Sequence, residues 1–368
     1  MAALQQIDTL MRARRFGEAA QIAAQAAKQH PDHAGVWRSL GQVQEATGDF
    51  QGMQHSFEAL CKLTPNDAKA RLKLAQAHVQ QGAPNKALPM LEAVVKGAGA
   101  DAFLLLQAGQ LYTHLALYPE AYNCLACAVE IRPDDAQALY NLATGATALG
   151  KLEEAEKLFS RVIAVKPDDY DAYYNRSTLR KWTADDNHIA EMEGLLKAGI
   201  PDRKGAVQLF HALAKEYEDL GDAPNAFAHL RRGADLRASM MAYHVSTDTD
   251  AMADIAAAFD EGFYADLPKA EDGPGPIFIV GLPRTGTTLV DRVLSSHTDV
   301  GSLGEIHDFV AALTRLCGQA QNKKDLIEKS TRVDMPALGA AYLESTRARG
   351  VEKAYLIDKT PANFLYLG

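Results

Sequence analysis

The chain has 368 residues, of which 47% are hydrophobic and 23% are charged, with a formal net charge of -9 and a pI near 5.7. This length and composition predict two or three folded domains and argue against extended disorder. The acidic balance argues against a nucleic-acid partner, which needs accumulated positive charge, and no long uncharged apolar run indicates a membrane span. Four cysteines are too few for a disulfide framework, so we expect a reducing, cytoplasmic environment.

Helix-breaking residues recur in the first part of the chain with a period of 34 residues. The prolines on this grid are Pro31, Pro65, Pro133, Pro167 and Pro201. The one grid position without proline holds Gly99, which also terminates helices. Between these breaks, apolar residues recur at spacings of three and four, and Thr47-Gly48-Asp49 is typical of a short turn. Each repeat is therefore predicted to be a helical hairpin.

The residue pattern within each period resembles the tetratricopeptide repeat over residues 1–235. Small residues recur at one helical position, and aromatic residues fill the gaps between helices. The small residues are Gly41, Ala75, Gly109 and Ala143, and the aromatic residues are Trp37, Phe57, Tyr112 and Phe159. The sixth repeat, near 173–201, is divergent. The resemblance implies a solenoid whose concave groove binds a protein or peptide, with a spacer or dimerisation role as the alternative.

The segment 236–273 reads as helices that cap the solenoid, followed by a linker, and Pro274, Gly275 and Pro276 mark the next domain boundary. Residues 276–280, with the sequence PIFIV, predict a short buried strand. The loop GLPRTGTT at 281–288 follows at once and leads into an amphipathic helix. The third domain, 274–368, therefore begins with a strand, a glycine-containing loop and a helix.

This order of elements predicts an oxyanion site. The loop amides and the positive end of the helix dipole favour an anion. A guanidinium matches tetrahedral oxyanions, and threonine hydroxyls add donors. The residues expected to bind the anion are Arg284, Thr285, Gly286, Thr287 and Thr288. The glycine spacing copies the nucleotide-binding P-loop, but Thr287 replaces its lysine, which argues against a kinase or ATPase.

The string P-R-T-G-T-T after an apolar strand resembles the 5'-phosphosulfate loop of sulfotransferases. Arg284, the pair Gly304-Glu305 and the string D-K-x-P-x-N-F at 358–364 are similar to the tyrosylprotein sulfotransferase branch. This resemblance implies 3'-phosphoadenosine 5'-phosphosulfate as the donor, with Arg284 clamping its phosphosulfate. It also implies Glu305 as general base, Lys359 as the charge facing the bridging oxygen, and no metal. The acceptor that it implies is a hydroxyl or an amine, with protein tyrosine favoured and carbohydrate or small-molecule hydroxyls open.

The expected fold class is mainly α: a tetratricopeptide-type α-solenoid followed by a partial P-loop-like α/β sulfotransferase domain. Only two strands can be recognised, at 276–280 and 354–357, which is too few for a doubly wound sheet, so we expect the catalytic domain to be truncated. The alternative function is therefore a non-catalytic helical-repeat scaffold that carries an incomplete nucleotide-binding domain. Residues expected to be structural are Cys124 and Cys127, as core residues, and His297 and His307, as loop or helix-cap residues.

Overall fold

The computed structural model describes residues 2–81, 83–265, 267, 275–318, 320–347 and 349–367. Its contacts divide the chain into two compact units, Met1–Met241 and Ala242–Gly368. Pro274, which we expected at a domain boundary, lies outside the described residues.

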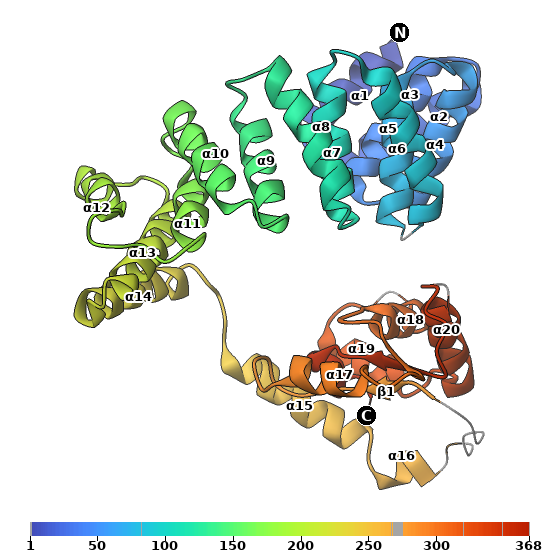
Figure 1. Ribbon diagram of the computed structural model, residues 1–368. Helices are drawn as coiled ribbons and strands as arrows, with labels where there is room; N and C mark the ends of the chain where they lie inside the picture. Colours follow the sequence, from blue (N-terminus) through green and yellow to red (C-terminus); the bar gives the residue numbers. More distant parts are fainter. Residues whose placement is uncertain are drawn as a thin grey trace. The chain divides into compact units, whose positions relative to one another are not determined.

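The first unit is a stack of helices in which most consecutive helices pack against each other (Figure 1). Its helices are α1 (Ala2–Arg12), α2 (Phe16–Gln29), α3 (Ala34–Thr47), α4 (Phe50–Leu63), α5 (Ala68–Gln80), α6 (Pro84–Ala98), α7 (Ala102–His114), α8 (Tyr118–Ile131), α9 (Ala136–Ala148), α10 (Leu152–Val165), α11 (Tyr170–Thr178), α12 (Ile189–Ala198), α13 (Arg203–Asp219) and α14 (Ala223–Ala238). Every proline of the 34-residue grid lies between two helices, as does Gly99. The predicted helical hairpins are confirmed.

Aspartates begin several of these helices. Asp67 accepts a hydrogen bond from the Ala70 amide at 3.0 Å, and Asp101 and Asp135 cap α7 and α9 in the same way. Capping satisfies amides that have no partner inside the helix. At these three breaks, a proline or glycine follows one helix, and an aspartate two residues later starts the next.

The small residues of the repeat lie where two helices approach closely. A Cβ atom added at Gly109 would lie 2.7 Å from Cγ of Leu125, and one at Gly41 would lie 2.6 Å from Cε2 of Phe57. Both distances are shorter than packed carbon atoms allow. The buried side chains Leu125 and Phe57 therefore occupy the space that these glycines leave.

Gly109→Ala is expected to destabilise the solenoid by about 1–3 kcal/mol through overpacking, although alanine favours helix by about 1 kcal/mol. Chemical denaturation of the wild type and the variant would measure this. The matched control is Gly97→Ala in α6, where an added Cβ meets nothing within 4 Å and is expected to be neutral or stabilising. Equal destabilisation by both substitutions would contradict close packing at Gly109.

The divergent sixth repeat is held by a buried polar cluster. Trp182, in the long connection between α11 and α12, is 1% exposed, and its indole donates to the Ser177 carbonyl at 2.7 Å. Glu216 is fully buried and accepts from the His188 amide and the Ser177 hydroxyl, both at 2.6 Å. Burial opposes ionisation of Glu216, but hydrogen bonds from the ring of His188, the Ser177 hydroxyl and the His188 amide hold the pKa of its carboxyl below the usual range. Trp182 supplies the aromatic bulk that the second helix of this repeat lacks.

The second unit contains a small parallel sheet and surrounding helices (Figure 1). Its elements are α15 (Val245–Ala258), α16 (Glu261–Ala265), β1 (Ile277–Phe278), α17 (Thr287–Leu294), β2 (Val300–Ser302), α18 (Asp308–Cys317), α19 (Lys323–Ser330), α20 (Met335–Arg347), β3 (Tyr355–Asp358) and the 3-10 helix η1 (Pro361–Leu365). The strand order is β1-β3-β2, and both pairings are parallel. Ile277 pairs with Ile357, and Val300 pairs with Tyr355.

Two features of this unit differ from the expectations. The sequence does not predict β2, because three residues around Gly301 carry no apolar run; a Cβ at Gly301 would lie 2.6 Å from Cγ1 of Val351. The helix α15, expected to cap the solenoid, belongs to the second unit and packs against α19. An amphipathic helix shows an apolar face but not its partner, so the sequence could not assign α15 to either unit.

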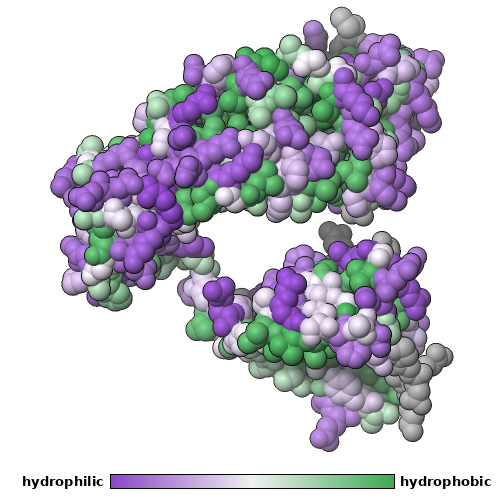
Figure 2. All heavy atoms as spheres, viewed as in Figure 1, coloured by the Kyte–Doolittle hydropathy of each residue, from purple (hydrophilic) through white to green (hydrophobic). Residues whose placement is uncertain are grey.

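The amphipathic helix predicted after the glycine-containing loop is confirmed as α17, but its apolar side faces outward. Leu289 is 70% exposed and Val293 is 62% exposed, whereas Asp291 is 3% exposed. Figure 2 shows that exposed hydrophobic residues are interspersed among hydrophilic ones on the surface of each unit. The hydrophobic pattern of α17 therefore predicts the helix correctly but not the side that is buried.

Candidate functional site

The three predicted site segments meet at one edge of the sheet. Because β1, β2 and β3 are parallel, their carboxyl ends lie at the same edge, where the segments at 279–286, 303–305 and 359–360 begin. Backbone hydrogen bonds join the segments beyond the strands. The Gly281 amide donates to the Pro361 carbonyl at 3.1 Å, and the Lys359 amide donates to the Gly304 carbonyl at 2.9 Å. The glycine-containing loop is thus anchored to the segment after β3, which contains Lys359.

The loop leads directly into the N-terminus of α17. Gly286 occupies the N-cap position with φ 97°, a left-handed conformation that favours glycine. Within the described residues, the amides of Gly286, Thr287 and Thr288 have no hydrogen-bond acceptor, and neither do the hydroxyls of Thr287 and Thr288. The Thr285 hydroxyl instead donates to the Leu282 carbonyl at 2.7 Å and closes the turn. The first turn of the helix therefore offers free donors to an anion.

Arg284 has an unusual backbone conformation for its residue type. Its φ is 70°, which is uncommon for a residue other than glycine and is found at sites where strain has a role. The side chain is exposed and forms no hydrogen bond or ion pair with any described residue. A guanidinium in this position is free to bind a tetrahedral oxyanion.

Glu305 and Lys359, 54 residues apart in sequence, form an ion pair. Nζ of Lys359 lies 2.5 Å from Oε1 of Glu305. The lysine side chain is only 10% exposed, whereas that of Glu305 is 58% exposed. Thr360 fixes the two backbones, because its hydroxyl donates to the Ile306 carbonyl at 2.7 Å and accepts from the Ile306 amide at 2.9 Å. The carboxylate is therefore open to a substrate, while the ammonium is held beneath it.

A buried polar cluster forms around Asp358, the residue before Lys359. Asp358 is fully buried and accepts from the Thr360 amide at 3.0 Å, the Asn363 side chain at 3.0 Å and the Tyr342 hydroxyl at 3.1 Å. Burial and the neighbouring Asp358 carboxylate raise the pKa of Tyr342 far above its ordinary value, so the hydroxyl stays a donor. Asp358 and Asn363 belong to the string at 358–364, but the sequence did not predict a role for either of them. Nothing in the sequence links Tyr342 to this site.

The helix that follows Glu305 is anchored by a bidentate ion pair. Asp308, the first residue of α18, accepts from Nε of Arg349 at 2.9 Å and from Nη2 at 2.5 Å. Burial raises the pKa of the Asp308 carboxyl, but the hydrogen bonds and charge of Arg349 outweigh it and hold this pKa below its usual range. This contact fixes the start of α18 three residues after the proposed base.

Asp308→Asn is expected to lower the stability of the second unit by about 1–2 kcal/mol at about pH 7. Because the folded pKa of Asp308 is depressed, its contribution is complete above the pKa of an unfolded aspartate, about 4. The contribution is lost as pH falls through the folded value, so the difference between wild type and variant should shrink progressively below about pH 4. Thermal melting at about pH 7 and at a pH below about 4 measures this difference. The control Asp254→Asn changes an exposed carboxylate with no partner among the described residues, so it should leave stability unchanged at both pH values. A stability difference between wild type and Asp308→Asn that persists in acid would contradict the account.

The residues expected to be structural lie as follows. Cys124 is buried in the hydrophobic core of the solenoid, as predicted, and burial raises the pKa of its thiol to about 11, whereas Cys127 is exposed. His307 occupies the N-cap position of α18, and Nδ1 of His297 accepts from the Asp299 amide at 3.2 Å. Among the described residues, no group of three or more histidine, cysteine or acidic side chains could hold a metal ion. No helix in the described ranges is long and apolar enough to cross a membrane.

Comparisons with protein-family models identify both parts of the chain. Residues 276–368 match the sulfotransferase family, and residues 4–52 and 105–176 match tetratricopeptide-repeat models. The chain is therefore a tetratricopeptide-repeat array followed by a sulfotransferase-family domain. Membership of the tyrosylprotein sulfotransferase branch stays a prediction.

Similar proteins extend the comparison. A protein of Aquifex aeolicus (strain VF5), described as an uncharacterized protein, is 27% identical over 203 residues, which cover 52% of this chain and 26% of that protein. The match thus spans about a quarter of the length of that relative. The crystal structure of YrrB, a tetratricopeptide protein with an unusual peptide-binding site, is similar at 19% identity, a TM-score of 0.40 and coverage of 48% of this chain and 91% of that chain. The C-terminal part of a repeat protein from Cytophaga hutchinsonii matches at 14% identity, a TM-score of 0.48 and coverage of 63% and 98%.

Proposed function

We propose that this chain, a tetratricopeptide-repeat solenoid joined to a sulfotransferase-family domain, transfers a sulfuryl group from 3'-phosphoadenosine 5'-phosphosulfate to an acceptor hydroxyl. The observation that carries the proposal is the meeting of three segments at the carboxyl edge of the sheet. They bring three groups to one edge: a helix N-terminus and an arginine that have no partners among the described residues, and an acid–lysine pair. Sulfuryl transfer needs each of these groups.

The loop between β1 and α17 binds the 5'-phosphosulfate in this proposal. The amides of Gly286, Thr287 and Thr288 and the hydroxyls of the two threonines donate to its oxygens. Arg284 adds a charged, bidentate contact. Thr285 supports the loop through its bond to the Leu282 carbonyl rather than through the ligand. The positive charge and the dipole both stabilise the negative charge on the oxygens during transfer.

The chemical step then proceeds by in-line displacement at sulfur. The acceptor oxygen forms a bond to sulfur as the bond between sulfur and the bridging phosphate oxygen breaks. Glu305 takes the proton of the acceptor hydroxyl, and Lys359 stabilises the negative charge on the departing phosphate oxygen. The products are the sulfate ester of the acceptor and adenosine 3',5'-bisphosphate. No electrons are exchanged with a redox partner.

The ion pair between Glu305 and Lys359 is the resting form of this site. While the two groups are paired at 2.5 Å, Lys359 does not face a donor. The phosphosulfate of a bound donor is anionic, like the Glu305 carboxylate. Its oxygens near the bridging position therefore compete with that carboxylate for the ammonium of Lys359. Separation of the pair leaves the exposed Glu305 free to accept a proton. Donor binding thereby prepares the base.

The solenoid supplies a partner surface in the same proposal. Tetratricopeptide repeats generally bind proteins or peptides, and stacked helical pairs form an extended concave surface. A protein tyrosine presented by a bound polypeptide is the acceptor that we favour, with carbohydrate and small-molecule hydroxyls as the alternatives. The cytoplasmic location expected from the four cysteines, all free in the structure, stays a prediction.

Mass spectrometry tests the proposed function. The chain is incubated with 3'-phosphoadenosine 5'-phosphosulfate and a panel of tyrosine peptides, oligosaccharides and small phenols, and the products are searched for added sulfate. We expect sulfate on one class of acceptor and formation of adenosine 3',5'-bisphosphate in equal amount. A panel without any sulfated product, together with peptide binding by the solenoid, would instead favour a non-catalytic scaffold.

A further inference from the structure

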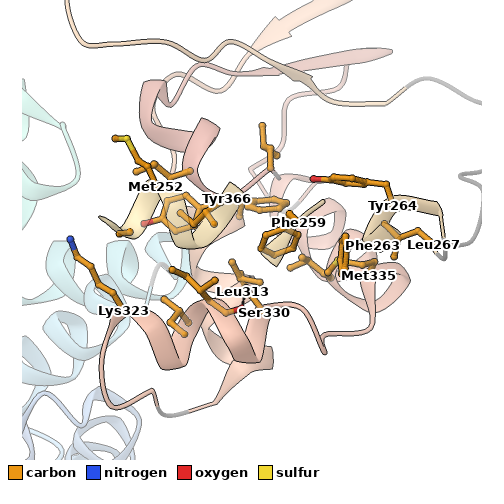
Figure 3. A pocket seen from close by; sticks show the side chains of 18 of the residues that line it. Met252, Phe259, Phe263, Tyr264, Leu267, Leu313, Lys323, Ser330, Met335 and Tyr366 are labelled. Carbon is orange, nitrogen blue, oxygen red and sulfur yellow. Dashed lines mark hydrogen bonds between the residues drawn. The ribbon is translucent and has the colours of Figure 1, made fainter. Parts of the chain in front are cut away.

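The second unit contains a cavity of about 580 Å³ that the proposed reaction does not use (Figure 3). It lies among α15, α16, α18, α19, α20 and the residues that follow η1. Most of its lining is apolar and includes Met252, Phe259, Phe263, Leu313 and Met335. Cavities of roughly 300–1,000 Å³ with such linings are typical of small-molecule sites. Arg284, Glu305 and Lys359 are not among its lining residues.

The charged groups at this cavity neutralise each other. Asp248 and Lys323 are its only charged lining residues within the described ranges, and their side chains form an ion pair at 2.8 Å. Both side chains are partly exposed, at 42% and 62%, so they lie where the cavity opens to water. The Tyr243 hydroxyl also donates to Asp248 at 3.0 Å. An ionised ligand would therefore lose its hydration without gaining a free partner charge.

One buried hydroxyl in the lining, that of Ser330, is also satisfied. The Ser330 hydroxyl donates to the Ile327 carbonyl at 2.7 Å. Apolar cavities of this size take up apolar molecules in preference to water, since water needs several polar partners. The methionines Met252 and Met335 are flexible side chains that adapt to ligands of different shape. The lining of the cavity therefore favours hydrophobic ligands and does not require a particular pattern of hydrogen bonds.

Gly339 marks a part of the cavity wall from which no side chain projects. It lies inside α20 and lines the cavity, and an added Cβ atom would meet nothing within 4 Å. Any side chain at 339 would narrow the cavity and would also favour the helix.

We propose that this cavity binds an uncharged, lipophilic small molecule. Its apolar body lies along Phe259, Leu313 and Met335, and its polar end lies at the Asp248–Lys323 pair. Figure 3 shows Lys323 at one end of the group of labelled side chains and Tyr264 and Leu267 at the other, which suits an elongated ligand. The proposal concerns a site separate from the sulfuryl-transfer residues and does not depend on that activity.

Fluorescence titration with the neutral probe N-phenyl-1-naphthylamine tests this site in the full chain. We expect saturable binding of one probe per chain, displaced by 1-dodecanol and displaced much more weakly by dodecanoate. Gly339→Leu is expected to weaken probe binding by at least about tenfold, because the leucine side chain narrows the cavity that the probe occupies. The matched control is Gly194→Leu in α12, an exposed glycine where an added Cβ also meets nothing within 4 Å; it should leave the probe affinity unchanged.

Gly339→Met provides a second variant whose flexible side chain fills the same space without strain. Loss of probe binding in both Gly339 variants, with cooperative melting retained, would bear out the proposal. Equal affinity in all variants, no binding by the wild type, or stronger displacement by dodecanoate than by 1-dodecanol would each overturn it. Loss of cooperative melting in both variants would also overturn it, because the space above Gly339 would then be occupied.

Discussion

Arg284→Ala is expected to weaken the binding of adenosine 3',5'-bisphosphate by roughly 10- to 100-fold. A hydrogen bond to a charged group contributes about 1.5–3 kcal/mol, and each 1.4 kcal/mol is a factor of about ten in affinity. The guanidinium has no partner among the described residues, so no internal ion pair has to be broken when it binds the 5'-phosphate. Isothermal titration calorimetry at fixed ionic strength measures the change.

Two further variants separate geometry from charge. Arg292→Ala removes an exposed arginine of α17 that has no partner among the described residues, and it should change the affinity by less than about twofold. Arg284→Lys keeps the charge but loses the planar fork, so it should fall between wild type and Arg284→Ala. Equal losses for Arg284→Ala and Arg292→Ala would show that only general electrostatic attraction is at work.

Glu305→Gln is expected to reduce sulfuryl transfer by about 10²- to 10⁴-fold, the usual contribution of a general base. The affinity for adenosine 3',5'-bisphosphate should stay within about twofold of the wild type or become tighter. Glutamine cannot form the ion pair with Lys359, so the ammonium no longer has to leave a carboxylate when the nucleotide binds. The acceptor identified by mass spectrometry serves as the substrate in the rate measurement.

The control for this prediction is Glu352→Gln, which changes an exposed glutamate just before β3 with no partner among the described residues. It should alter neither the rate nor the affinity. If Glu305→Gln and Arg284→Ala caused the same loss of nucleotide affinity, the proposed division between donor binding and proton transfer would be wrong. A fully active Glu305→Gln variant would exclude this residue as the base.

Local and repeating features of the fold could be predicted from the sequence. The 34-residue grid of prolines places the breaks between helices, and its regularity alone identifies the repeat. The order of strand, loop and helix around Arg284 is equally local. For the site, the sequence predicted roles for Glu305 and Lys359 but not that their side chains pair directly. Only the parallel order β1-β3-β2 brings those two segments together.

Features that depend on contacts between residues far apart in the chain could not be predicted from the sequence. The bond between Tyr342 and Asp358 and the ion pair between Asp308 and Arg349 join positions with no shared periodicity. The strand β2 is too short to show an alternating pattern, and its place beside β3 follows from tertiary contacts. The outward apolar side of α17 has the same origin, because periodicity shows a face but not its neighbour.

The central claim is that the turn between Val280 and Leu289 binds the 5'-phosphate of a nucleotide donor. Nuclear magnetic resonance of the backbone amides during titration with adenosine 3',5'-bisphosphate tests it most directly. We expect the amide signals of Gly286, Thr287 and Thr288 to shift downfield and saturate together as each donates a hydrogen bond to the phosphate. Signals at these three positions that do not move while the nucleotide binds elsewhere, or an absence of binding altogether, would contradict the account.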